Sequence, residues 1–337
     1  MCAKSCVFAR PLATSCGKEA TDSPCGTLPP VDLVDKDTVR FPDALPKMPT
    51  LSPPVLSAVH TPEEILGHPR FAAARAAFID AVLAFHEGDR LSSRLMVETM
   101  RQVTFNLIII LHLRHDVADR STWPTPQRLK AVIGPYKLAS PRRVDALVAR
   151  LVQLGCVDSR PSEIDGRVRL LKPTPKMMAL DREWLFYNYV PLHVMFPDGY
   201  AEPIMRDGAF QRAQRLVALE FAPRSTQMMA SVPAVMRFMH RDAGILVLIK
   251  LIQMSAGDVA KVLSHTDLGA RFGVSRTHVR ELLEDAAQHG DVSLSGRGGR
   301  LVELKPSILE AFDRFLAGAM SAHDAMYHLA RERMRRP

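Results

Sequence analysis

Apolar residues recur at the spacing of an α-helix along most of the chain after residue 70. The first such stretch has apolar residues at Phe71, Ala74, Phe78, Ala81, Val82 and Phe85. Two more, near 103–113 and 243–252, are apolar over most of their length and are predicted to form buried helices. Residues 1–65 have neither a helical nor a strand period and are rich in Pro, Ser, Thr and Asp, which predicts a mostly disordered arm.

Two parts of the chain repeat one another. Ser140-Pro-Arg-Arg-Val144 aligns with Ser275-Arg-Thr-His-Val279 at an offset of 135 residues, and Gly166–Thr174 aligns with Gly299–Ser307 at an offset of 133. Each repeat covers roughly 75 residues, near 103–178 and 243–318, which is too long a period for a solenoid. The pattern therefore predicts the duplication of a whole domain.

The second repeat gives the clearer order of elements. Residues 266–272 predict a helix, Gly273 a tight turn, and Ser275 the N-cap of a second helix that Gly290 ends. The buried side of that second helix is predicted to be Val279, Leu282, Leu283 and Ala286. Alternating residues on either side of the turn 296–299 predict two short strands. Helix, turn, helix and β-hairpin is the order of a winged helix-turn-helix.

The first repeat has the same order. A helix is predicted from Pro124-Thr125 to Ile133, Gly134-Pro135 breaks it, and Ser140 followed by Pro141 starts the next helix. The buried side of this helix is predicted to be Val144, Leu147, Val148 and Leu151. A hairpin then turns at Asp165-Gly166, and the connection between the two helices is several residues longer than in the second repeat.

The segment Asp267-Leu-Gly-Ala-Arg-Phe-Gly-Val-Ser-Arg-Thr-His-Val-Arg280 resembles the winged helix domain of bacterial transcriptional regulators of the MarR type. Such regulators usually pair two single-winged subunits, so the resemblance implies a covalent pseudo-dimer. The expected fold class is mainly α with small β-hairpins (α+β), as two tandem winged helix-turn-helix domains joined by helices with pseudo-twofold symmetry. The expected division is an arm at 1–65, a helical segment with the first winged domain at 66–180, a helical linker and inter-domain core at 181–242, and the second winged domain with a C-terminal helix at 243–337.

The charge of the chain changes the picture in favour of nucleic acid. The net charge is +8 and the isoelectric point is about 9.4, which suits a polyanionic partner. The excess is concentrated in the first repeat, because residues 125–175 contain ten Lys and Arg against four Asp and Glu, whereas residues 266–305 contain six of each. The first repeat is therefore expected to contribute more to affinity.

Side chains near the start of each second helix are expected to read base edges, and side chains at the hairpin tips to contact phosphate or the minor groove. Arginine suits both roles because its planar fork bridges guanine acceptors or clamps a phosphate. The expected DNA contacts of the first repeat are Arg142, Arg143, Ala146 and Arg150 on the helix and Arg160, Arg167 and Arg169 at the wing tip. Those of the second repeat are Arg276, Thr277, His278 and Arg280 on the helix and Arg297 and Arg300 at the wing.

The expected partner is double-stranded DNA with a pseudo-palindromic site, and the expected function is transcriptional regulation. Two alternatives remain open at this point: a plasmid-type replication initiator, and a tandem winged helix scaffold that binds protein. No P-loop, GxGxxG after a strand, HExxH or GxSxG motif is found, so neither an enzyme nor a cofactor is expected. Segment 184–221, which holds eight of the 21 aromatic residues, is predicted to be an inter-domain core; a small-molecule effector pocket is the alternative. A homodimer remains an open expectation.

Four of the five cysteines lie near the N-terminus, at Cys2, Cys6, Cys16 and Cys25. Their spacing fits no paired CxxC pattern, so incidental thiols are favoured over a metal or redox site. Cys156 lies in an apolar setting and is expected to be a small core residue. The longest apolar run, Leu107–Leu111, is too short to cross a bilayer, and the N-terminus lacks the pattern of a signal peptide, so the expected location is the cytoplasm.

Overall fold

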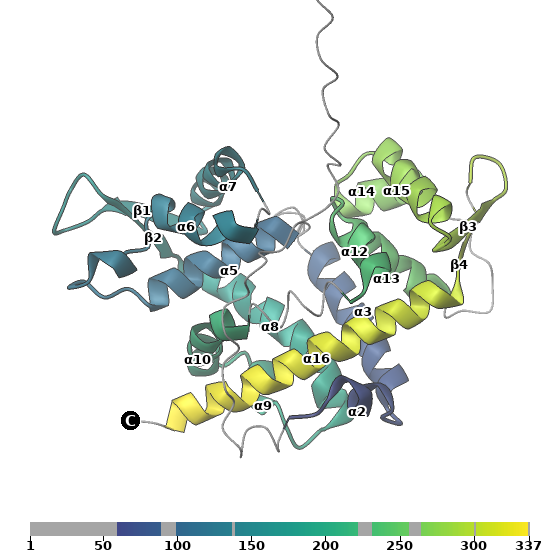
Figure 1. The fold of residues 1–337 in the computed structure, drawn as a ribbon, viewed down its shortest axis with the longest axis horizontal. Coiled ribbons are helices and arrows are strands. Elements are labelled where there is room, and N and C mark those ends of the chain that lie inside the picture. Colours follow the sequence, from purple (N-terminus) through teal and green to yellow (C-terminus); the bar gives the residue numbers. More distant parts are fainter. Residues whose placement is uncertain are drawn as a thin grey trace, which may run out of the picture. The chain divides into compact units, whose positions relative to one another are not determined.

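The structure is a computed structural model and describes residues 59–88, 99–136, 139–221, 231–255, 264–299 and 301–335. It is mainly helical with two small antiparallel β-hairpins, in agreement with the α+β class predicted from the sequence (Figure 1). The described elements, in chain order, are α2 (Pro62–Leu66), α3 (Phe71–Gly88), α5 (Thr99–Leu113), η1 (Arg120–Thr122), α6 (Pro126–Ile133), η2 (Gly134–Tyr136), α7 (Pro141–Gln153), β1 (Val157–Pro161), β2 (Arg169–Pro173), α8 (Pro175–Met195), α9 (Ala201–Ile204), α10 (Gly208–Ala218), η3 (Leu219–Phe221), α12 (Pro233–Met239), α13 (Gly244–Ser255), α14 (His265–Phe272), α15 (Arg276–Gln288), β3 (Val292–Ser295), β4 (Leu301–Leu304) and α16 (Pro306–Arg335).

The same order of elements occurs twice. Helices α5, α6 and α7, the β1–β2 hairpin and the long helix α8 correspond to α13, α14 and α15, the β3–β4 hairpin and the long helix α16. Helices α7 and α15 are both 13 residues long and begin 135 residues apart, which is the offset of the sequence repeat. Both hairpins are antiparallel, but their registers differ by two residues: Val157 pairs with Pro173, whereas the corresponding Val292 pairs with Leu304, the counterpart of Leu171. The repeat seen in the sequence is therefore a repeat of secondary structure.

The first repeat encloses a hydrophobic core of its own. Helix α5 supplies more of its buried apolar side chains than any other element, which explains why this helix is apolar over most of its length. Leu129 of α6 and the predicted stripe on α7 close the core on one side, and Cys156 and Leu171 of the hairpin region close it on another. Cys156 is completely buried, as expected for a small core residue.

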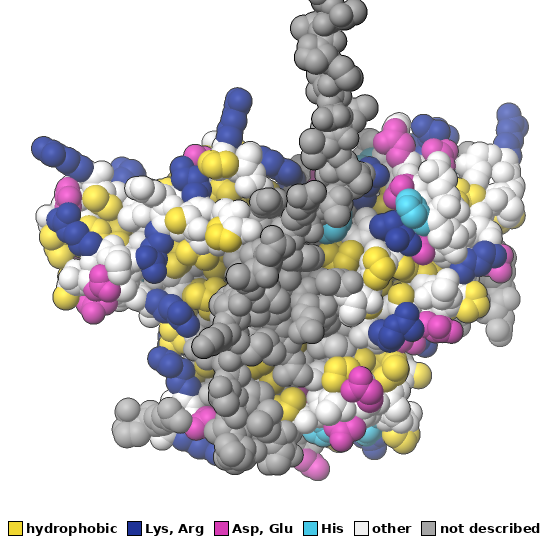
Figure 2. Space-filling view, in the orientation of Figure 1, with side chains coloured by type: hydrophobic (Ala, Val, Ile, Leu, Met, Phe, Trp, Pro, Cys, Tyr) yellow, Lys and Arg dark blue, Asp and Glu magenta, His cyan; other side chains and the backbone are white. Residues whose placement is uncertain are grey.

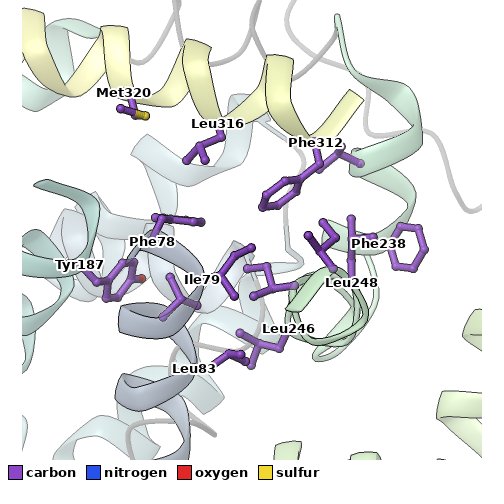
Figure 3. Packing of buried hydrophobic residues seen from close by; sticks show 14 of the residues in the cluster. Phe78, Ile79, Leu83, Tyr187, Phe238, Leu246, Leu248, Phe312, Leu316 and Met320 are labelled. Atoms are coloured by element: carbon purple, nitrogen blue, oxygen red, sulfur yellow. The ribbon is translucent and has the colours of Figure 1, made fainter. Parts of the chain in front are cut away.

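The second repeat shares its core with the central helices. Helices α3, α12, α13 and α16 converge in this core, and Figure 3 shows Phe78, Ile79 and Leu83 of α3 beside Leu246 and Leu248 of α13. Phe312, Leu316 and Met320 of α16 lie along the other side of the same cluster in Figure 3. The hydrophobic effect therefore joins the second repeat to α3 and α8 as one packed unit.

Helix α8 belongs to both cores, and this differs from the predicted division of the chain at residue 180. Its first turn places Met177 in the core of the first repeat, whereas Leu185, Tyr189 and Leu192 lie in the shared core. The predicted boundary thus falls inside a 21-residue helix. The reason is that α8 starts at the N-cap Thr174 and continues without interruption to Met195.

The structure also differs from the predicted arm at residues 1–65. Residues 59–65 form ordered structure, because Thr61 makes a capping box with Glu64 at the start of α2, and Ile65 is fully buried. The remainder of the predicted arm, with the cysteines at 2, 6, 16 and 25, lies outside the described residues.

A cluster of polar residues fixes this N-terminal segment to α16. The carboxylate of Asp324 is fully buried and receives the backbone N–H of His60 at 2.8 Å and the hydroxyl of Tyr200 at 2.7 Å. His60 Nδ1 and His328 Nε2 lie 2.9 and 3.2 Å from the same carboxylate. Burial alone would raise the pKa of Asp324, but the hydrogen bonds outweigh it and the pKa lies below its ordinary value. We call these four residues the clasp.

The aromatic residues of segment 184–221 are packed against one another. Tyr189 is fully buried and lies near Tyr200, Phe210 and Tyr327, with ring centroids 6.1, 5.6 and 6.1 Å away. Its hydroxyl donates to the backbone carbonyl of His323 at 2.9 Å. Burial, helped by the positive charge of Arg215, lowers the pKa of His323 to about 3, so this imidazole is neutral at physiological pH. This packing supports the interpretation of the segment as a hydrophobic core.

A buried ion pair joins α8 to α10. Arg215 is 2% exposed and places Nη2 2.5 Å and Nε 3.1 Å from Oδ1 of Asp181, which is fully buried. Gln211 donates to the other carboxylate oxygen at 2.7 Å, and the guanidinium of Arg215 lies 4.6 Å from the centre of the Trp184 ring. Each charge is therefore matched on several sides, as burial requires.

Replacement of Asp181 by Asn should reduce the free energy of unfolding by about 3–5 kcal/mol, because the buried guanidinium of Arg215 would lose its counter-charge. The matched control is Glu183→Gln, on the same helix. Glu183 also pairs with an arginine, Arg206, but that pair is about 40% exposed and should contribute less than about 1 kcal/mol. Urea unfolding followed by circular dichroism measures both. Equal losses in the two variants would contradict the special role of the buried pair.

Candidate nucleic-acid interface

Helix α7 begins where the sequence predicts it to begin, with Ser140 as N-cap and Pro141 as the first helical residue. Ser140 has an extended backbone and its Oγ accepts from the backbone N–H of Arg143 at 3.4 Å. Pro141 occupies the first helical position, where its missing N–H costs nothing. Helix α6 is held against α7 by the ion pair of Lys130 with Asp145, at 2.9 Å. The N-terminal turn of α7 is therefore well defined.

The two sides of α7 differ in kind. The predicted stripe of Val144, Leu147, Val148 and Leu151 is buried, which confirms that part of the prediction. The opposite side carries Arg142, Arg143, Ala146 and Arg150, and all four are exposed. Since Arg142, Ala146 and Arg150 are four residues apart, they form one row along the helix. We call Arg142, Arg143, Ala146 and Arg150 the α7 face; Lys and Arg side chains project over α7 in Figure 2.

The arginines of this face are available to a ligand to different degrees. Within the part of the chain that the structure describes, the side chain of Arg142 has neither an ion pair nor a hydrogen bond to another residue. Arg150 makes one long hydrogen bond, at 3.5 Å, with Gln153 of its own helix. Neither side chain has a contact within the protein that would compete strongly with a phosphate or a guanine.

The first hairpin places only one of its three predicted arginines at the tip. Arg160 lies in β1 opposite Leu170 and pairs with Asp158 at 3.0 Å. Arg169 lies in β2 and donates to Ser159, both at the hydroxyl and at the backbone carbonyl. The predicted placement of Arg160 and Arg169 at the wing tip is therefore wrong, because both residues belong to the paired strands beside the turn. Arg167 is exposed in the turn itself.

The turn of the first hairpin is braced from outside the hairpin. Asp165 accepts from the backbone N–H of Arg167 at 3.2 Å, and its other carboxylate oxygen lies 3.4 Å from Nη1 of Arg120. Ser162 N–H donates to the carbonyl of Val168 at 2.8 Å across the turn. Arg120 could not be predicted as part of this site, since nothing in its sequence neighbourhood indicates a partner 45 positions away.

Two glycines set the geometry of the second repeat. Gly273 has φ of +73° between α14 and α15, a conformation that glycine adopts without strain. At Gly269 in α14, a Cβ atom would lie 2.7 Å from the backbone oxygen of Val274, so only glycine allows this close approach. The prediction of a tight turn at Gly273, with Ser275 as the next N-cap, is confirmed: Ser275 Oγ accepts from the N–H of His278 at 3.0 Å.

The predicted contact residues of α15 are less available than those of α7. Arg276 and Thr277 are exposed, but His278 is half-buried and its Nε2 lies 2.8 Å from the backbone oxygen of Asp242. Arg280 is paired with Glu284 one turn later, at 3.1 Å. His278 and Arg280 thus already have partners in this chain, and sequence spacing gave no sign of the contact of His278.

The second hairpin has a glycine-rich turn. Gly296, Gly298 and Gly299 all have positive φ, and Arg297 is exposed among them. Arg300, the other predicted contact, lies outside the described residues.

Histidines and metals add little to this surface. Burial, followed by the positive charges of Lys172 and His115, lowers the pKa of His112 on α5, so its imidazole is neutral at pH 7. Among the residues that the structure describes, no three His, Cys, Asp or Glu side chains are grouped so as to hold a metal ion.

None of the described helices combines the length and the apolar character needed to span a membrane.

No family model, no curated protein and no solved structure matched this chain.

Substitution of Gly269 by Ala should lower the free energy of unfolding by about 1–3 kcal/mol, because the new Cβ would force α14 and the start of α15 apart. Thermal unfolding measures the loss. Gly166→Ala is the control, since a Cβ at this position would have no atom within 4 Å. Gly166 lies in the turn of the first hairpin. If both variants melt alike, the close approach at Gly269 does not constrain the fold.

Proposed function

We propose that the chain is a sequence-specific double-stranded DNA-binding protein that regulates transcription. In this proposal each repeat is a winged helix-turn-helix domain of the kind that MarR-type regulators contain, with α7 and α15 as the second helices and the two hairpins as wings. The observation that carries the proposal is the α7 face, an exposed helix face with three arginines that begins close after an N-cap and lies opposite a buried stripe.

The geometry of the α7 face suits the major groove. The groove is about 12 Å wide and admits one helix, whose N-terminal residues then meet base edges. Arg142 and Arg143 occupy the second and third positions of α7, where the positive end of the helix dipole adds to their attraction for phosphate. Ala146 lies one turn later and leaves room for the helix to approach the bases.

The first hairpin suits a backbone contact. Arg167 is exposed in a turn that Asp165, Ser162 and Arg120 hold in one shape, so the backbone of the turn loses little conformational entropy when a phosphate binds the Arg167 side chain. A wing contact of this kind adds affinity without choosing a sequence.

The decisive experiment begins with a DNA duplex that the full chain selects from a random-sequence pool. Replacement of Arg142 by Ala should weaken binding to this duplex by about 1–3 kcal/mol and relax the preference at one base position. Arg314→Ala is the matched control, since Arg314 is an exposed arginine on α16 that pairs with Glu310 at 3.9 Å, and it should bind as the parent does. Fluorescence anisotropy titrations measure both.

If no sequence is enriched from the pool, the proposal is wrong. Enrichment of several copies of one short repeat, in place of one palindrome, would favour the replication-initiator alternative.

Replacement of Arg167 by Ala should act differently from replacement of Arg142. Binding to the selected duplex and to a scrambled duplex should weaken to a similar extent, because a phosphate contact is common to both. The slope of log K against log salt should fall by about 1, as one fewer counterion is released. Titrations between about 50 and 200 mM salt test this. A change in base preference with an unchanged slope would show that Arg167 does not contact phosphate.

A further inference from the structure

The two second helices can be compared position by position, because their burial fixes the register. The buried residues of α7 are Val144, Leu147, Val148 and Leu151, and those of α15 are Val279, Leu282, Leu283 and Ala286. Each pair is 135 positions apart, and the N-caps Ser140 and Ser275 keep the same offset. Residues at this offset therefore lie at the same place on the surface of the two helices.

In this register the α7 face corresponds to a face of opposite charge. Arg142 corresponds to Thr277, Arg143 to His278, Ala146 to Glu281 and Arg150 to Asp285. The face thus carries three arginines and an alanine in the first repeat, and two carboxylates, a threonine and a histidine in the second. Glu281, where α7 has the small Ala146, is exposed at the centre of the face. A carboxylate at that place would meet phosphates and the acceptor-rich groove floor, where like charge repels.

The basic residues of α15 do not restore the lost charge. His278 lies against the backbone oxygen of Asp242, and Arg280 pairs with Glu284. Asp285 lies 4.0 Å from Nη2 of Arg241 and 3.7 Å from Nδ1 of His289, so positively charged or titratable groups of this chain lie beside its carboxylate. Arg276 corresponds to Pro141, which lies one residue before the first residue of the α7 face.

We infer that the chain reads bases through the α7 face alone, and that α15 is a helix of the same form which does not read DNA. This inference rests on the proposed function and narrows it. One chain then recognises one half-site, and a palindromic duplex takes two chains. It replaces the expectation of two reading helices in one covalent pseudo-dimer.

Substitutions at corresponding positions of α7 and α15 test the inference, with binding measured on the duplex selected by the full chain. Arg142→Ala and Ala146→Glu, both at exposed positions, should each lower the ratio of selected to scrambled binding by about tenfold or more. The corresponding Thr277→Ala and Glu281→Ala should leave the ratio within about twofold of the parent. Arg276→Ala should likewise leave it within about twofold. Circular dichroism confirms that each variant is folded.

The number of chains per duplex gives a second measurement. Mass photometry on a palindromic duplex should show two chains bound, and on a duplex with one half-site a single chain. A fall in the binding ratio for Thr277→Ala or Arg276→Ala, or one chain protecting both half-sites, would overturn the inference and leave the proposed function standing. If the parent chain shows no preference for any duplex, the proposed function and the inference both fall.

Discussion

The ion pair of Asp181 with Arg215 lies on α8 between the residues of one hydrophobic core and those of the other. A buried carboxylate and a buried guanidinium tolerate few arrangements, because each must keep its partners in hydrogen-bonding geometry. The pair therefore fixes the rotation of α8 about its own axis against α10. Since the same helix continues from the first hairpin into the shared core, the pair also sets how the first repeat is attached to α10, which packs against α5 as well.

Much of the local structure could be predicted from the sequence. N-caps at Ser140 and Ser275, the turn at Gly273 and the buried stripes of α7 and α15 depend on neighbours within four residues, and such signals survive without knowledge of the fold. The repeat could be detected because the N-cap and the buried positions of α7 recur in α15 at the same offset. The α7 face followed from these stripes, since the exposed side of an amphipathic helix is fixed once its buried side is known.

The rest depended on contacts between residues far apart in sequence. Neither the brace from Arg120 to Asp165 nor the contact of His278 with Asp242 leaves a periodic trace. The placement of Arg160 and Arg169 could not be predicted for a related reason: backbone pairing puts both residues in the strands, and their side chains have partners in the hairpin itself. The predicted boundary at residue 180 falls inside α8, because a continuous helix carries no composition change where it passes from one core to another.

The clasp bears on how the molecule comes to be folded. It joins His60 to Asp324, residues separated by 264 positions, so it closes nearly the whole described chain into a loop. Contacts of such long range cost the most chain entropy and form late in folding. During synthesis α2 leaves the ribosome long before α16 exists, and Ile65 and His60 must wait for the final helix. The contacts that hold the N-terminal segment can therefore form only after α16 has been made, and a chain without Asp324 would lose the hydrogen bonds to His60 and Tyr200.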